Sequence, residues 1–395
     1  MIPCHVNAAV AFSPAYVLGD APGTRNAREG DGNDIPLDPA FKFDARTAPV
    51  CFIHGGVDPH SPLGSTRLYR RFRAAGVPAE VHVHPDKPHG VFGFARGLEF
   101  LRQLGFLGAL APEEKIMDRF ASDSGRASCT KLPVWPEGRT PDPQEGQCEP
   151  YIEWHMPEKL STRALQMIWA GGCYTDNRPE DFEVAPARRY LNARGMAVVT
   201  VKYRCPRPAA PLAKFVTAWQ DVQRAVRIVR SQAAERGLDP GRIGVMGSSA
   251  GGHLALMAAT SSRHKSYLPI DRLDAEVPCT VQWAVCIYPA YVLTDGVETP
   301  NSTGGNDDSA LLAPEFSFDP DTPPILFVHG DSDVWAAMNS VKCWEQLRRM
   351  GLQGELHTLA TRGHCFHREA SPGTGSYTVL DRIGEFLAEK GFLPA

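Results

Sequence analysis

A nucleophilic serine is the first chemistry that the sequence suggests. Residues 247–251 read Gly-Ser-Ser-Ala-Gly, a GxSxG pattern that stands between a short apolar segment and a segment typical of a helix. At such a strand-to-helix turn, small residues must flank the nucleophile, and the N–H groups of the new helix point toward a developing oxyanion. The pattern therefore predicts Ser249 as the nucleophile. The alternative is that Ser248 or Ser249 only caps the helix.

An acid and a base for this serine follow it in the chain. A serine hydroxyl reacts near neutral pH when a base lies within hydrogen-bond reach and an acid orients that base. Asp333 follows the apolar segment 324–330, and His364 follows the segment 354–359. The order Ser, Asp, His is the one used by α/β-hydrolases. We therefore predict Asp333 as the acid and His364 as the base.

Three other side chains compete for these two roles. Asp331 is the alternative acid, although the internal repeat described below aligns Asp333 with a second aspartate and Asp331 with a glycine. His357 and His367 are the alternative bases. His357 lies inside an expected strand, where packing explains it better.

Oxyanion donors are expected in the loop after the apolar segment 164–170. Residues 168–174 read Ile-Trp-Ala-Gly-Gly-Cys-Tyr, and the two glycines would let the backbone approach a substrate. We predict that N–H groups of Gly172, Cys173 and Ala250 form the oxyanion hole. An ordinary glycine turn is the alternative at this loop.

Alternating strands and helices must position these residues. Strands are predicted at 164–170, 195–203, 242–246, 281–288, 324–330 and 354–359, and helices at 212–236, from about 250, at 336–350 and at 376–390. Near-continuous apolar strands that alternate with helices indicate a parallel sheet covered on both faces. The fold class predicted is α/β, with a mainly parallel central sheet.

One segment of the chain occurs twice. Residues 3–89 align with residues 278–364 without a gap, so that Asp58 aligns with Asp333 and His89 with His364. No GxSxG pattern precedes the first copy. We interpret residues 1–107 as a partial α/β-hydrolase unit, equivalent to the C-terminal half of such a domain, which either belongs to a truncated reading frame or serves as a packing module.

The expected organisation is a partial unit at 1–107, a linker at 108–127 and a complete catalytic domain at 128–395. The partial unit contributes three expected strands, and three parallel strands with an open edge do not readily bury both faces alone. We therefore expect this unit to pack against the rest of the chain or against a second copy of the protein. In the second case the protein would self-associate through this unit.

Composition excludes several classes of partner. The 395 residues are 43% hydrophobic and 22% charged, with a formal net charge of −4. These values fit a soluble globular protein without a basic surface for nucleic acid, and no apolar run reaches the roughly 20 residues that span a bilayer. No secretory signal is evident, and the compartment is left open.

The ten cysteines show no zinc-binding spacing, so neither a metal nor another cofactor is expected. Most of them are expected to be small core residues. Cys129 and Cys148 bracket a stretch rich in proline and glycine, and a disulfide between them could close this loop.

Taken together, the segments IWAGGCYTDN, IGVMGSSAGGHLA, VHGDSD and GHCF resemble bacterial carbohydrate esterases of the α/β-hydrolase fold, a group similar to acetylxylan and feruloyl esterases. The resemblance covers about residues 128–395. It implies ester hydrolysis through Ser249, Asp333 and His364, with acetyl or feruloyl esters on plant xylan, or small esters, as substrates. The sequence departs from the family pattern at Cys173, where a third glycine is usual. A prolyl-oligopeptidase-like peptidase and a non-catalytic binding protein on the same fold are the alternative functions.

Overall fold

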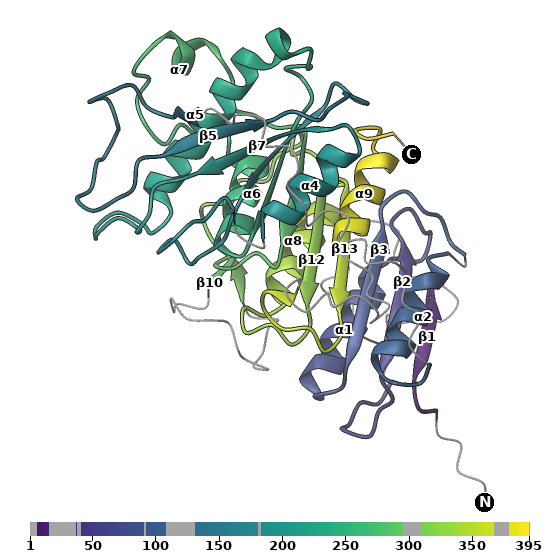
Figure 1. The fold of residues 1–395 in the computed structure, drawn as a ribbon. Helices are drawn as coiled ribbons and strands as arrows, with labels where there is room; N and C mark the ends of the chain where they lie inside the picture. Colours follow the sequence, from purple (N-terminus) through teal and green to yellow (C-terminus); the bar gives the residue numbers. More distant parts are fainter. Residues whose placement is uncertain are drawn as a thin grey trace, which may run out of the picture.

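The computed structural model describes residues 6–15, 37, 41–90, 92–107, 131–180, 183–294, 310–366 and 379–394. Within these residues one large sheet contains eleven strands in the order β1-β2-β3-β13-β12-β9-β8-β6-β7-β5-β4 (Figure 1). Its strands are β1 (Ala9–Phe12), β2 (Val50–Gly55), β3 (Ala79–His84), β4 (Lys131–Pro133), β5 (Tyr151–His155), β6 (Leu165–Trp169), β7 (Ala197–Lys202), β8 (Ile243–Ser248), β9 (Trp283–Ile287), β12 (Ile325–Gly330) and β13 (Gly354–Leu359). The predicted linker 108–127 lies outside the described residues.

The remaining elements are mostly helices that connect these strands. They are α1 (Leu63–Ala74), α2 (Phe94–Gln103), α4 (Ala185–Ala193), α5 (Val216–Ala233), η1 (Ala234–Arg236), α6 (Ala250–Thr260), α7 (Arg272–Glu276), α8 (Met338–Arg349) and α9 (Val379–Glu389), with a separate antiparallel pair β10 (Leu293–Thr294) and β11 (Leu311–Leu312). No helix among the described residues combines the length and the apolar character needed to cross a bilayer.

The predicted α/β class and the mainly parallel sheet are confirmed. Strands β6, β7, β8, β9, β12 and β13 pair in parallel, and the predicted helices lie between them. The antiparallel edge formed by β4 and β5 adds two strands to those predicted. An edge strand tolerates proline because one side of its backbone needs no partner.

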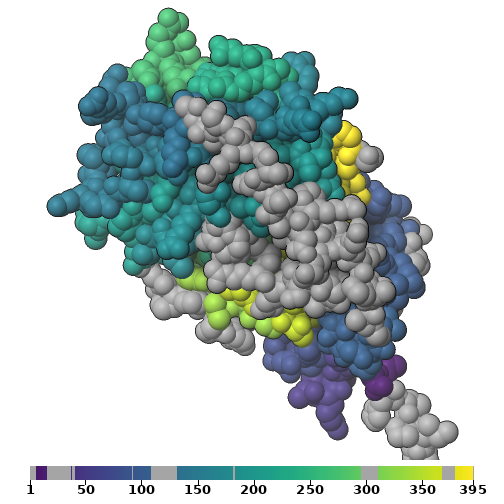
Figure 2. Space-filling model, in the orientation of Figure 1, coloured from purple at the N-terminus to yellow at the C-terminus, as the bar shows by residue number. Residues whose placement is uncertain are grey.

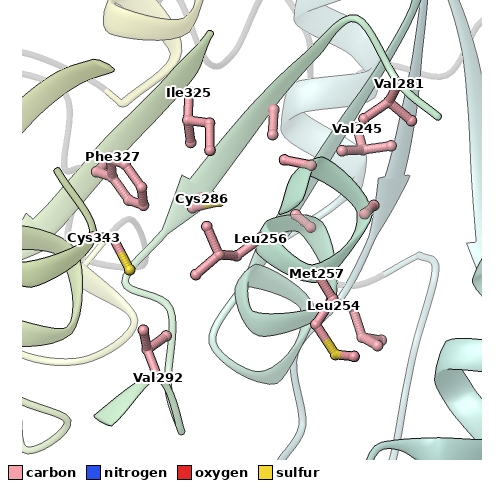
Figure 3. Packing of buried hydrophobic residues seen from close by; sticks show 14 of the residues in the cluster. Val245, Leu254, Leu256, Met257, Val281, Cys286, Val292, Ile325, Phe327 and Cys343 are labelled. Carbon is pink, nitrogen blue, oxygen red and sulfur yellow. The ribbon is translucent and has the colours of Figure 1, made fainter. Parts of the chain in front are cut away.

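Apolar side chains cover both faces of the sheet. On one face, α5, α6 and α8 pack on β8, β9 and β12, and on the other face α4 and α9 do so. Figure 3 shows Leu256 of α6, Cys286 of β9 and Phe327 of β12 among the side chains that fill the space between helix and sheet. These three side chains are 0% exposed. Helix α6, which begins directly after Ser249, is therefore held rigidly against the sheet.

The N-terminal strands extend this sheet at the β13 edge. Strand β3 pairs antiparallel with β13, and His82 lies directly opposite His357. The N-terminal elements form one end of the molecule, coloured purple to blue in Figure 1 and at the lower right of Figure 2. The edge of β3 is thus covered by the rest of the same chain.

The direction of this pairing follows from the repeat in the sequence. His82 and His357 occupy equivalent positions in the two aligned segments, 275 residues apart. When two equivalent strands contact each other through the same edge, a local two-fold axis relates them, and such an axis reverses the strand direction. The two central strands of such a repeat therefore pair antiparallel, although the strands within each half pair in parallel.

Four buried side chains form a hydrogen-bonded chain across this junction. Glu80 Oε2 lies 3.0 Å from His82 Nε2, the Nδ1 atoms of His82 and His357 lie 2.8 Å apart, and His357 Nε2 lies 2.6 Å from Glu355 Oε1. Three such contacts need three protons, whereas two neutral imidazoles supply two. Burial, with a further contribution from Glu389, raises the pKa of Glu355 to about 8. The Glu355 carboxyl group therefore supplies the third proton at neutral pH.

We expect this junction to weaken as the pH rises. The folded protein keeps a proton on Glu355 that the unfolded chain releases above the ordinary pKa of 4.5. The stabilisation is therefore complete below that value and is lost as the pH rises toward 8, by at most about 1.4 kcal/mol per pH unit. Glu355→Gln, which keeps an N–H donor for His357, should flatten the dependence of the unfolding free energy on pH between 5 and 8, as measured by urea unfolding.

The matched control is Glu276→Gln on α7, where the exposed carboxylate pairs with Arg272 of the same helix. This variant should keep the wild-type slope. Equal slopes for Glu355→Gln and the wild-type protein would contradict the proton assignment.

Candidate active site

Ser249 lies in a strained turn between β8 and α6. Its backbone has φ 55° and ψ −120°, outside the regions that most residues adopt, and its N–H donates to Ile287 O at 3.0 Å. The side chain is almost completely buried. This geometry matches the turn that the GxSxG pattern predicts, in which a strand gives way at once to a helix.

The glycines of the pattern are required by close backbone contacts. A Cβ on Gly251 would lie 2.5 Å from Ala170 O, and one on Gly247 would overlap the backbone of Gly251. The Trp169 indole N–H also donates to Gly251 O at 2.8 Å. The turn that carries Ser249 is therefore packed directly on the end of β6, where the predicted oxyanion loop begins.

The structure brings Ser249, His364 and Asp333 together from three separate segments. His364 Nε2 lies 2.9 Å from Ser249 Oγ, and His364 Nδ1 lies 3.0 and 2.8 Å from the two carboxylate oxygens of Asp333. An ionised carboxylate only accepts hydrogen bonds, so Nδ1 carries the proton and Nε2 accepts from the serine hydroxyl. This arrangement prepares Nε2 to take up a proton from Ser249.

The environment of Asp333 keeps its carboxyl group ionised. Burial alone would raise its pKa, but the neighbouring imidazoles of His329 and His364 outweigh burial and hold the pKa of Asp333 well below its usual range. His329 Nε2 lies 3.3 Å from the carboxylate, and its Nδ1 is fixed at 2.8 Å from Ser340 Oγ. The Trp335 N–H also donates to Asp333 at 2.8 Å.

The alternative acid Asp331 and the alternative base His357 lie away from Ser249. Asp331 accepts from the Tyr69 hydroxyl at 2.6 Å and pairs with Arg73 at 2.9 Å, so this side chain faces α1 of the N-terminal unit. His357 belongs to the junction between β13 and β3, and His367 lies outside the described residues. Helix α1 thereby holds the loop that presents Asp333.

The predicted oxyanion residues are close to Ser249 in the chain or follow a residue that contacts it: Ala250 directly follows Ser249, and Gly172 and Cys173 follow Gly171. A Cβ on Gly171 would lie 2.8 Å from Ser249 Cβ, so the loop after β6 passes directly over the serine. Gly172 and Cys173 follow as exposed residues with φ of 104° and 55°, and Ala250 is the buried first residue of α6. Among the described residues, none of the hydrogen bonds uses the amide of Gly172, Cys173 or Ala250 as donor.

The sequence does not identify two side chains that support this loop, Glu183 and Tyr288. The Glu183 carboxylate accepts from the Gly171 N–H at 2.6 Å and from the Tyr288 hydroxyl at 3.1 Å. The Tyr288 ring packs on His364, with ring centroids 4.7 Å apart. Glu183 thus connects the loop at Gly171, through Tyr288, to the imidazole of His364. A lone glutamate in a polar segment before α4 carries no sequence signal for this role, because both of its partners are distant in the chain.

The first copy of the repeat contains a second Asp-His pair. His89 Nδ1 lies 3.1 and 3.0 Å from the two oxygens of Asp58, close to the values for His364 and Asp333. The side chain of His89 is 49% exposed, against 19% for His364. Among the described residues, no serine hydroxyl contacts His89 Nε2.

One group in the described part of the chain has the chemistry of metal ligands. It comprises Cys51, Glu80 and His82, all buried in β2 and β3. Glu80 and His82 already hydrogen-bond each other, and Glu80 also accepts from the Ala360 N–H at 2.8 Å. This cluster belongs to the junction of the two halves and not to the site at Ser249.

The central part of the chain is similar to a known protein family. Residues 152–347 match the BD-FAE family. The acetylxylan esterase of Xylanibacter ruminicola is 26% identical over 221 residues, which cover 53% of this chain and 42% of that protein. Esterase LipQ of Mycobacterium tuberculosis is 31% identical over 259 residues, or 59% of this chain and 58% of LipQ. The chain thus spans about half the length of the curated relatives it matches.

Solved structures agree on the fold. An acetyl ester-xyloside bifunctional hydrolase from Caldicellulosiruptor lactoaceticus superposes with a TM-score of 0.51 and 24% identity, covering 67% of this chain and 97% of that one. Thermogutta terrifontis esterase 2, in a form phosphorylated by paraoxon, gives a TM-score of 0.53 and 21% identity. The match covers 68% of this chain and 96% of the esterase chain. These likenesses concern the fold alone.

A mainly parallel sheet covered on both faces, with a serine at a strand-to-helix turn, defines an α/β-hydrolase. More specifically, residues 152–347 match the BD-FAE family of this fold, and the homologues of the chain include carboxylic ester hydrolases. The N-terminal unit and His364 lie outside the residues matched to the family.

Replacement of Glu183 tests how the loop at Gly171 is held. Glu183→Ala removes the acceptor of the Gly171 N–H and of the Tyr288 hydroxyl. A buried donor left without its acceptor costs about 1–3 kcal/mol, and we expect a loss of unfolding free energy of at least that size in urea. Glu180→Ala, a nearby carboxylate that is 67% exposed, serves as the control. It should change stability by less than about 0.5 kcal/mol, and equal stability of both variants would contradict the proposed support.

Proposed function

We propose that the protein is a serine carboxylesterase that removes acetyl or feruloyl groups from xylan or its oligosaccharides. The observation that carries this proposal is the hydrogen-bonded chain from Ser249 through His364 to Asp333. A serine with a base and an orienting acid in this order is the arrangement that nucleophilic acyl transfer needs.

The proposed reaction begins with attack of Ser249 Oγ on the ester carbonyl carbon. His364 Nε2 accepts the hydroxyl proton as the new C–O bond forms, while Asp333 holds Nδ1–H and stabilises the imidazolium. His364 then returns the proton to the departing sugar oxygen as the ester C–O bond breaks. Water, activated by the same imidazole, hydrolyses the acyl-enzyme and restores Ser249.

The negative charge on the carbonyl oxygen needs preorganised donors. The Ala250 N–H stands at the N-terminus of α6, where the helix dipole favours negative charge. Gly172 and Cys173 follow Gly171, whose position over Ser249 is held by Glu183 and by the Tyr203 hydroxyl, which donates to Gly171 O at 3.0 Å. We propose that Ala250 together with Gly172 or Cys173 binds the oxyanion.

Acetyl esters of carbohydrates are the substrate class that we place first. The relatives include an acetylxylan esterase and an acetyl-hydrolase, and the similar structures include an acetyl ester-xyloside hydrolase. The weakly negative chain also suits a neutral sugar better than a polyanion. Release of acetate from acetylated xylan and of ferulate from feruloylated xylo-oligosaccharides would distinguish the two acyl groups.

Replacement of the serine tests the proposed nucleophile. Ser249→Ala should lower kcat toward p-nitrophenyl acetate by about 10⁴-fold or more and abolish labelling by a fluorophosphonate probe, with unchanged urea unfolding. Ser248→Ala is the matched control on the same turn, and it should keep labelling and activity. EDTA should leave the rate unchanged, because no step uses a metal.

Other outcomes would favour the alternative functions. Cleavage of a peptide amide in preference to the ester would indicate a peptidase. Absence of probe labelling at Ser249 in folded protein would indicate a non-catalytic role for the fold. Near-wild-type ester hydrolysis by Ser249→Ala would exclude the mechanism proposed here.

The two Asp-His pairs provide a matched test of the proposed base. His364→Ala should lower kcat by several orders of magnitude, because the acceptor of the serine proton is lost. His89→Ala removes an imidazole that has the same carboxylate contact but, in the part of the chain that the structure describes, no serine contact, and turnover should stay within about two-fold of wild type. Loss of turnover in both variants, measured on protein with intact circular dichroism, would mean that the first copy takes part in the reaction.

A further inference from the structure

Two cysteines face each other where the β5–β7 ladder continues beyond its last paired residues. Strands β5 and β7 are antiparallel, with Tyr151 opposite Lys202. Extending this register by three residues places Cys148 opposite Cys205, and the Cys148 N–H donates to Cys205 O at 2.9 Å. Residues directly opposite in an antiparallel pair have Cα atoms about 4.5–5.5 Å apart, within the range that a disulfide spans.

The two side chains point toward each other. Cys148 Sγ lies 3.6 Å from Cys205 Sγ and 3.5 Å from Tyr203 O, and both cysteines are free thiols. A disulfide needs a sulfur–sulfur distance of about 2.05 Å. Because backbone and side chains already face each other, small side-chain rotations suffice to form the bond. The sequence suggested a different disulfide, between Cys148 and Cys129. Cys129 lies outside the described residues.

We propose that Cys148 and Cys205 are a thiol-modification site that forms a reversible cross-strand disulfide with small disulfide oxidants such as oxidised glutathione. The proposal does not depend on the esterase activity.

The two cysteines differ in exposure and in pKa, and these differences indicate which cysteine reacts first with the oxidant. Cys148 is half-buried, whereas Cys205 is buried. The hydrogen bond from the Cys205 thiol lowers the pKa of Cys148 to about 6, and the same bond raises the pKa of Cys205. Thiolates, and not thiols, attack disulfides. Cys148 is therefore the residue that meets the oxidant, and Cys205 is the residue that resolves the intermediate.

The exchange balances with one molecule of oxidised glutathione. The Cys148 thiolate attacks one glutathione sulfur, the glutathione disulfide breaks, and one glutathione leaves as a thiolate. Cys205 then releases its proton to solvent and attacks Cys148 Sγ, which breaks the mixed disulfide and releases the second glutathione. Two cysteine thiols are oxidised, and one external disulfide is reduced to two thiols.

The bond would fasten the strand end that supports the site at Ser249. Tyr203, two residues before Cys205, donates its hydroxyl to Ala170 O and Gly171 O at 3.0 Å each. Arg204, between them, is locked to the buried Asp221 at 2.8 Å. A covalent link from Cys148 to Cys205 would tie this segment to the start of β5 and close a loop between positions 57 residues apart.

The experiment uses the full chain, reduced with dithiothreitol and desalted, then incubated with oxidised glutathione. Free thiols are alkylated at low pH, and the protein is digested without reduction. Mass spectrometry should find the peptides of Cys148 and Cys205 joined, with a mass two hydrogens below their sum, and dithiothreitol should separate them. The oxidised protein should show a Tm higher by on the order of 5 °C, because the cross-link restricts the unfolded chain.

Matched variants decide the assignment. Cys148→Ser and Cys205→Ala should each lose the joined peptides and the oxidant-dependent rise in Tm, with Cys205→Ala keeping a glutathione adduct on Cys148. Cys173→Ser, which removes an exposed cysteine, should keep both the joined peptides and the rise. A stable glutathione adduct on Cys148 in the wild-type protein, a linkage of Cys148 to Cys129, or an unmodified Cys148 would each overturn the proposal.

Discussion

The close backbone packing at the turn after β8 is the constraint on which the site depends. Gly251 lies so near Ala170 O that a methyl group would stand 2.5 Å from it. Real contacts of that kind are much longer, so the end of β6, the turn and the start of α6 are locked together. Ser249 is fixed in a strained conformation as a result, and the loop at Gly171 is brought over it.

The other parts of the site are delivered to this fixed point by neighbouring strands. Asp333 and His364 follow β12 and β13, and the carboxyl ends of parallel strands meet at one edge of the sheet. Glu183 then connects the loop at Gly171 to Tyr288, whose ring packs on His364. The serine, the imidazole and the loop at Gly171 are thereby held by a shared set of buried contacts.

The N-terminal elements continue the sheet and contact the rest of the chain. They reproduce the Asp-His contact at Asp58 and His89, and they join the sheet through β3 and β13. Helix α1 also contacts the loop of the acid, through Tyr69 and Arg73 on Asp331. The described N-terminal residues therefore extend the sheet and restrain a loop of the candidate site, while the imidazole of His89 is half-exposed.

Sequence alone determined the α/β class and the GxSxG turn, because both are encoded locally: apolar periodicity sets the strands, and small residues permit the turn. Chain order favoured Asp333 and His364 as partners of Ser249, but it left Asp331, His357 and His367 as alternatives. Tertiary structure alone decided the contacts between segments distant in the chain. The contact of Glu183 with Gly171, the pairing of Cys148 with Cys205 and the contact between the edges of β3 and β13 each depend on how separate elements are placed. Such placement is set by packing the whole sheet, and no local pattern at either residue records it.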